Sequence, residues 1–215
     1  MYTQRRYDNK PSSQHAPWRI DWDLPVGLQF CSYIGQIHDF SPDATIGSKV
    51  QPIKREWIEW WKQQLSAFAS NAASSSAALP SAMSVLDGPG FEPPLFPELA
   101  ARPNLQMACR EHWPYFSQVW NGTGSGQRQL NEKLSQLRRQ IDLNELVQKC
   151  VQLTGRSGSA AFSLQIGVIR WPEDYRLAVS KDCLVIGAAY LEQEQRQSML
   201  SVLQSQICEL MNAKS

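Results

Sequence analysis

The sequence predicts an α+β fold that is mostly helical, with a small C-terminal β-hairpin or three-stranded sheet packed on the last helix. Three observations predict this class. Apolar residues recur at helical spacing over residues 52–69 and 130–151, and again near the C-terminus. Residues 162–170 alternate apolar and polar side chains, as a strand does. Two apolar stretches, residues 177–179 and 184–191, flank a short turn, which is typical of a hairpin.

The composition sets limits on function. Hydrophobic residues make up 42% of the 215 residues, which is enough for a core, and 21 basic residues stand against 20 acidic ones. Because no strongly basic face is expected, nucleic-acid binding is disfavoured. No apolar run reaches 18 residues, so we expect no membrane span and no membrane partner. No apolar segment follows Arg5 and Arg6, so we expect no export signal.

The five cysteines are odd in number and lie far apart in the chain. This pattern is more typical of reduced, buried thiols than of a disulfide framework. We therefore expect a cytoplasmic protein, with free thiols at Cys31, Cys109, Cys150, Cys183 and Cys208.

The composition also divides the chain into four segments. Residues 1–17 are polar and predict a flexible tail. Residues 18–69 form an N-terminal segment that contains a tryptophan-rich helix. Residues 70–104 are rich in Ser, Ala and Pro, and they hold six of the thirteen prolines, which predicts a linker or a wrapping segment. Residues 105–215 predict a C-terminal α+β domain.

The N-terminal segment contains one clear helix. Residues 18–40 give a mixed signal, because WRIDWDL alternates loosely and VGLQFCSYIGQI is compatible with a strand pair or with a short helix. Pro52 then begins a helix, since proline is favoured in a first helical turn. The apolar stripe of this helix, widened by Trp60, consists of Ile53, Trp57, Trp61, Leu65 and Phe68.

The middle of the chain predicts a docked segment and a second helix. Phe91, Leu95 and Phe96 predict that part of the wrapping segment lies against an apolar surface. The next helix is expected over residues 105–120, with a kink or a break at Pro114.

The C-terminal domain predicts three helices around its strands. After a loop at residues 121–127, one helix has the stripe Leu130, Leu134, Leu137 and Ile141. Asp142 and Glu145 form a variant of the capping box, so a new helix starts there, and Gly155 ends it. The final helix is expected from about Glu192, with a core stripe of Met199, Leu203, Ile207 and Leu210.

Aromatic residues supply the candidate partner interface. The stretch WIEWW is compatible with a platform for a base, a sugar or a partner helix, although its spacing favours a stripe that faces the core. Trp60 is the member that we expect to be exposed. The candidate interface residues are Trp57, Trp60, Trp61, Phe91 and Phe96.

The stretch GTGSG supplies a candidate phosphate loop, since glycines let backbone N–H groups approach a phosphate. No Walker lysine follows it, and the preceding FSQVW predicts a helix rather than a strand, so a flexible connector is favoured. The residues concerned are Gly122, Gly124, Ser125, Gly126 and Arg128. Elsewhere, Cys109 and His112 lie three apart on a helix, but two ligands do not complete a zinc site, so we expect no metal.

The order of elements over residues 143–211 resembles the zincin metallopeptidase domain of the CAAX-prenyl-endopeptidase type. In this lineup YRLA (residues 175–178) stands where that family has an N-A-F-A-like stretch, and VIGAAYL (residues 185–191) stands for its hairpin strand and turn. SVLQSQICEL (residues 201–210) then aligns without a gap with the active-site helix that bears H-E-x-x-H. The resemblance implies that residues 105–215 form a zincin-like domain.

The aligned helix lacks the catalytic groups of that family. The lineup puts Ser205 and Glu209 at the two histidine positions and Gln206 at the glutamate position. Serine is a poor zinc ligand and glutamine cannot accept a proton, whereas the motif needs two imidazoles and a carboxylate. The chain also stops at Ser215, before the helix that would supply the third ligand. The resemblance therefore implies a pseudoenzyme with no catalytic residues and no cofactor.

Three hypotheses about function follow. The first is a non-catalytic protein-interaction or scaffold subunit whose partner is another protein. The second is an enzyme of another class that binds a phosphorylated ligand at the GTGSG loop. The third is a nucleic-acid accessory protein that uses the tryptophan-rich helix with Lys54, Arg55 and Lys62, which the near-neutral charge disfavours.

Overall fold

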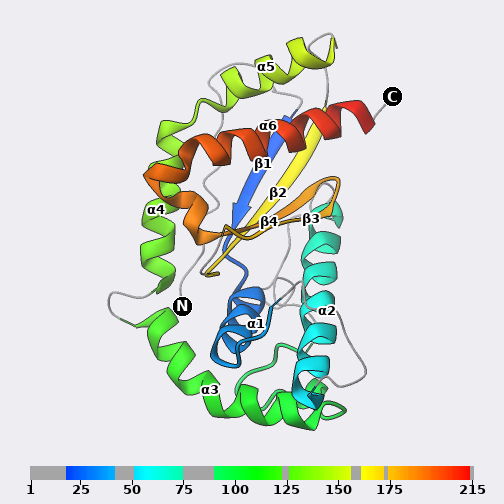
Figure 1. The fold of residues 1–215 in the computed structure, drawn as a ribbon, viewed down its shortest axis with the longest axis vertical. Helices are drawn as coiled ribbons and strands as arrows, with labels where there is room; N and C mark the ends of the chain where they lie inside the picture. Colours follow the sequence, from blue (N-terminus) through cyan, green and yellow to red (C-terminus); the bar gives the residue numbers. More distant parts are fainter. Residues whose placement is uncertain are drawn as a thin grey trace.

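The computed structural model describes residues 18–41, 51–74, 90–122, 126–155, 161–171 and 174–213, and for residues 71–74 only the backbone. It contains a four-stranded sheet with helices on both faces (Figure 1). The strands are β1 (Trp18–Asp23), β2 (Phe162–Ile169), β3 (Arg176–Ser180) and β4 (Cys183–Gly187). The longer helices are α1 (Val26–Ile37), α2 (Pro52–Ser74), α3 (Pro103–Asn121), α4 (Gly126–Gln140), α5 (Leu143–Thr154) and α6 (Arg196–Ala213). The predicted α+β class is confirmed.

The sheet has the order β1-β2-β4-β3, in which β3 alone is antiparallel to its neighbour. The predicted strand and hairpin are confirmed as β2 and as the β3–β4 pair. The fourth strand, β1, comes from the loosely alternating WRIDWD and pairs in parallel with β2, with Trp18 opposite Phe162. The N-terminal segment and the C-terminal domain therefore share one sheet.

β2 lies at the centre of the core and is covered on both faces. Leu164, Ile166 and Val168, which point to one face, are fully buried, and Gly167 on the other face is buried as well. A Cβ atom at Gly167 would lie 2.8 Å from the ring of Phe68 in α2, so glycine allows α2 to approach the sheet. α2 packs on this face and α6 contacts β2 as well, while α1 lies at the end of the strand (Figure 1).

The undecided stretch VGLQFCSYIGQI is a helix, α1. Polar side chains on α1 attach this helix to the end of β2. The Gln29 amide, which is 1% exposed, donates to the carbonyl of Val168 and accepts from the N–H of Arg170 at 2.8 Å. Ser32 donates to the Arg170 carbonyl at 2.8 Å. Gln29 and Ser32 interrupt the apolar pattern of this stretch in the sequence, and in the structure they hydrogen-bond to the end of β2.

α2 begins at Pro52, as predicted. Of its predicted stripe, Ile53 is partly buried, and the buried members are Trp57, Trp61, Leu65 and Phe68. The expectation that Trp60 is exposed is wrong, because this indole is 0% exposed. Trp60 contacts the ring of Phe30 at 6.3 Å, and Gly90 of the wrapping segment lies against its Nε1. Residues 90–99 cover the side of α2 that carries Trp60.

The wrapping segment docks as predicted, within the part that the structure describes. Phe91 and Phe96 are buried and pack against Phe30 at 6.1 and 5.5 Å. Leu95, which we grouped with them, is instead 64% exposed. The predicted tail at residues 1–17 and the first part of the linker, residues 75–89, lie outside the described residues.

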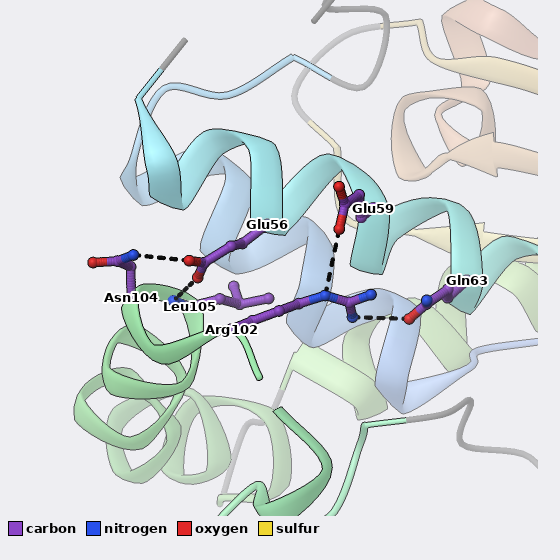
Figure 2. A network of polar contacts seen from close by, with 6 residues as sticks. All are labelled: Glu56, Glu59, Gln63, Arg102, Asn104 and Leu105. Atoms are coloured by element: carbon purple, nitrogen blue, oxygen red, sulfur yellow. Dashed lines mark hydrogen bonds and ion pairs between the residues drawn. The ribbon is translucent and has the colours of Figure 1, made fainter. Parts of the chain in front are cut away.

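α3 runs from Pro103 to Asn121, so Pro114 does not break it, although Figure 1 shows the helix axis turning along its length. Its start is held by α2 (Figure 2). Glu56 accepts from the Leu105 N–H and from the Asn104 amide, both at 2.8 Å. This carboxylate therefore caps α3 from a neighbouring helix.

The remaining helices follow the predicted signals closely. Asp142 accepts from the Glu145 N–H at 3.0 Å at the start of α5, and Gly155 ends this helix in the left-handed conformation with φ 66°. α6 begins at Arg196 rather than Glu192, because two short 3-10 turns precede it. Its predicted core stripe of Met199, Leu203, Ile207 and Leu210 is buried.

Candidate functional site

The three positions aligned with the metallopeptidase motif do not form a site in this structure. Ser205 and Glu209 are exposed on α6. Gln206 is 6% exposed, and its amide donates to the Lys181 carbonyl at 2.7 Å. Gln206 therefore holds the turn between β3 and β4 against α6. None of the three lines the groove described below.

The candidate phosphate loop is described only at its two ends, since Gly124 and Ser125 lie outside the described residues. Gly122 follows α3 and Gly126 begins α4. The Arg128 guanidinium forms an ion pair with Glu132 at 2.9 Å, one turn along the same helix. Phosphate binding at this loop stays a prediction.

The candidate interface of aromatic residues is a core instead. Trp57, Trp60, Trp61 and Phe96 are at most 2% exposed, and Phe91 is 8% exposed. These rings cannot reach a partner protein or stack on a nucleic-acid base in this conformation. The interface prediction is corrected for a physical reason, which is that α1, the wrapping segment and the sheet cover α2 on several sides.

The outer polar side of α2 is used within the molecule (Figure 2). Arg102 lies along this side, where its Nη1 donates to Gln63 at 2.8 Å and its Nε lies 3.7 Å from the Glu59 carboxylate. Together with the Glu56 cap, these contacts join α2 to α3. This side of α2 is therefore an internal contact.

Exposed apolar residues lie on α3. Met107 is 65% exposed, Tyr115 62% and Val119 41%. They are spaced by eight and four residues, so they lie in one row along the helix, with the exposed Glu111 between them. We call these four residues, Met107, Glu111, Tyr115 and Val119, the α3 surface.

The α3 surface rests on a packed aromatic base. Tyr115 stacks on Tyr33 of α1 with ring centroids 6.4 Å apart, and Tyr33 contacts Phe116 at 5.4 Å. Phe116 in turn packs on Phe30 at 4.9 Å. Burial, with a smaller effect from Tyr115, raises the pKa of Tyr33, so its phenol stays neutral. Within the α3 surface, Tyr115 is thus held by rings that pack beneath it.

Two histidines mark one edge of the α3 surface. The ring of His112 lies 5.9 Å from that of His38, at the end of α1, and 6.4 Å from that of Tyr33. Burial lowers the pKa of His38, and His112 lowers it further, while Glu111 acts in the opposite direction. His38 is therefore held mainly neutral at physiological pH.

The cysteine and histidine that we examined as metal ligands point to different places. Cys109 is 0% exposed in the core, whereas His112 contacts Tyr33 and His38 at the surface. Within the described residues, no three or more His, Cys, Asp or Glu side chains group as metal ligands would.

A groove of about 440 Å³ lies between the C-terminal half of α2 and the β3–β4 hairpin. Lys62 and Asp182 are the charged side chains that line it, and three serines provide hydroxyl groups. No hydrogen bond or ion pair joins Lys62 to another residue that the structure describes. The lining residues are Lys62, Leu65, Ser66, Ala69, Ser70, Val179, Ser180 and Asp182.

Sequence reasoning missed both the α3 surface and the groove. The sequence analysis predicts a helix over residues 105–120, which contains Met107, Tyr115 and Val119, and assigns these three residues no role. One signal was present, since they fall outside the stripe of Leu105, Cys109, Phe116 and Trp120 that α3 buries. The groove had no local signal, because its two walls come from residues 62–70 and 179–182, which are far apart in the chain.

Comparisons with known proteins give no relative. No protein family, no curated protein and no solved structure matches this chain. Of the helices in the described parts of the chain, none combines the length and the apolar character needed to cross a lipid bilayer.

Proposed function

We propose that this chain is a non-catalytic protein-interaction subunit that binds a partner protein through the α3 surface. The row of exposed apolar side chains at Met107, Tyr115 and Val119 carries this proposal. Several apolar side chains exposed along one side of a helix are compatible with an interaction site, and tyrosine is enriched among residues that dominate binding energy. The aromatic base under Tyr115 favours binding because less side-chain freedom remains to be lost.

The partner element that fits this row is an amphipathic helix. A row with a spacing of four residues forms a ridge, and helices pack by placing such ridges into each other's grooves. Glu111 is exposed in the middle of the row and forms no salt bridge within the described residues. We therefore expect apolar residues on the partner helix and a lysine or arginine opposite Glu111.

The zincin-like lineup supports the non-catalytic part of the proposal. In this lineup the helix has a packing role, because Gln206 ties it to the hairpin while Ser205 and Glu209 lie exposed. Metal analysis of the purified protein together with a peptidase assay tests this part. Stoichiometric zinc accompanied by peptide cleavage would overturn it.

Photo-crosslinking tests the interaction. A photoreactive residue replaces Tyr115 in one variant and Leu153 in the other, and the chain is produced at its natural level in its own cells. Leu153 is a matched control because it is 67% exposed but lies on α5. We expect a specific adduct at position 115, mapped to a helical segment of one protein, and none at 153.

A second experiment separates binding from folding. Met107→Ser with Tyr115→Ser should abolish the adduct formed by a crosslinker at Val119, while Leu153→Ser leaves it unchanged. The thermal midpoint of both proteins should stay within a few degrees of the original, since the changes are at the surface. Equal adducts from both variants would refute the proposed surface.

A further inference from the structure

We propose that the groove between α2 and β3 binds an extended peptide segment of a partner protein, which adds to β3 as a further strand. The segment carries small apolar side chains at alternate positions and one carboxylate that faces Lys62. This inference concerns a second site and does not rest on the α3 surface.

β3 is an edge strand of the sheet that the structure describes. It is the last strand in the order β1-β2-β4-β3. Within the described residues, no hydrogen bond joins the backbone of Arg176–Ser180 to any element other than β4. An edge strand of this kind is where an extended peptide gains affinity through main-chain hydrogen bonds.

The register of β3 limits where a peptide can pair. An irregularity between Ala178 and Ser180 interrupts the pairing with β4, so regular pairing covers Arg176, Leu177 and Ala178. Such bulges also protect edges against uncontrolled aggregation. The added strand is therefore short, and the groove beyond it must supply the remaining contacts.

α2 supplies one wall of the groove, and its side chains there are small. Ser66, Ala69 and Ser70 lie on one side of the helix, opposite Val179 of β3. Leu65 and Val179 provide an apolar floor, and Val179 is only partly buried. A helix beside an edge strand, with small residues between them, leaves space for alternate side chains of an added strand.

The charged side chains that line the groove determine which charge a bound peptide carries. Lys62 of α2 is the cation that lines the groove, and the hairpin contributes Val179, Ser180 and Asp182 to the same lining. The carboxylate of Asp182, the other charged group in the lining, accepts from the Ser180 hydroxyl at 2.7 Å. Lys62 is exposed and has no partner among the described residues, so a carboxylate of the peptide is its complementary group.

A displayed library of random twelve-residue peptides, screened against the full chain, tests the proposal. Two groove-filling variants, Ala69→Trp and Ser66→Trp, serve as counter-targets, and each must first show a cooperative unfolding transition. We expect enriched peptides with an aspartate or glutamate at a fixed position. Their synthetic forms should bind at least tenfold more weakly to both variants.

Charge reversal and hydrogen exchange complete the test. Lys62→Glu should weaken binding of the acidic peptide at least tenfold. The same variant should bind a peptide whose acidic residue is changed to lysine as tightly as the original chain binds the acidic peptide. Arg55→Glu is the matched control on α2 because Arg55 is exposed and lies outside the groove. The peptide should slow amide exchange in residues 176–179, and Met107→Ser with Tyr115→Ser should leave its binding unchanged.

Two results would overturn the inference. One is a screen that enriches no peptide over the two groove-filling variants. The other is a peptide that binds the chain but leaves exchange in β3 unchanged, because it would then bind elsewhere. Both results leave the α3 surface untouched, so the two proposals fail separately.

Discussion

α2 and α3 are both rich in apolar and aromatic residues, but they use them in opposite ways. Trp57 and Trp60 of α2 are fully buried, whereas Met107 and Tyr115 of α3 are more than half exposed. α2 is covered by α1, by the wrapping segment and by the sheet, while α3 buries a single stripe. Aromatic density in a sequence therefore does not identify an interface, because the neighbours of each helix decide which rings remain outside.

The largest expected effect is a loss of stability when a buried tryptophan of α2 is removed. Trp60→Ala should lower the free energy of unfolding by about 3–5 kcal/mol, because it leaves a cavity among packed rings. Tyr115→Ala should cost about 1 kcal/mol or less, since its ring is mostly in water. Urea denaturation measures both. Equal losses would mean that the α3 surface is part of the core.

A buried polar contact should have the next largest effect. Gln29→Leu leaves the Val168 carbonyl and the Arg170 N–H without partners at the end of β2, and we expect a loss of about 2–3 kcal/mol. Gln152→Leu on the exposed side of α5 is the control and should change stability by about 0.5 kcal/mol or less. A Gln29 variant as stable as the control would show that the amide is not needed to hold α1.

The contacts in Figure 2 predict unequal effects for two glutamates. Glu56→Ala removes the cap of α3 and should cost about 1 kcal/mol. Glu59→Ala removes a 3.7 Å ion pair whose carboxylate is half exposed, and should cost about 0.5 kcal/mol or less. The reverse order would assign the joint between α2 and α3 to Arg102 and Glu59 instead.

The reactivity of each cysteine thiol should follow the burial of its side chain. Burial raises the pKa of Cys31 and Cys109, and it raises the pKa of Cys150 and of Cys183 to about 12, so all four stay protonated at pH 8. Cys208, which is half-buried, should be the only thiol that Ellman's reagent labels in the folded protein. Cys208→Ser should abolish labelling, and rapid labelling of a second thiol would contradict the packing.

The smallest expected effect concerns the edge of the α3 surface. The pKa of His38 is lower in the folded chain than in the unfolded one, so the unfolded state binds more protons as the pH falls. Neutral His38 therefore contributes to the free energy of unfolding at a pH above its pKa in the unfolded chain. This contribution is lost as the pH falls from the pKa of the unfolded chain through the lower pKa of the folded chain. His112→Asn should raise the pKa of His38 in an NMR titration, whereas an unchanged value would mean that burial alone sets it.

Sequence alone determined the local elements of this fold. Pro52 at the start of α2, Asp142 and Gly155 at the ends of α5, and the alternation of β2 each depend on neighbours a few residues away. Periodicity and capping are local properties, so they can be read without the tertiary structure.

Tertiary structure decided which faces are covered and which segments meet. The helix α1 was undecided because Gln29 and Ser32 find their partners some 140 residues away, at the end of β2. Trp60 is buried because residues 90–99 return across α2, and the groove exists because Ala69 of α2 and Val179 of β3 line the same space. Burial is a property of the neighbours that long-range folding brings together, and no spacing within a single helix encodes them.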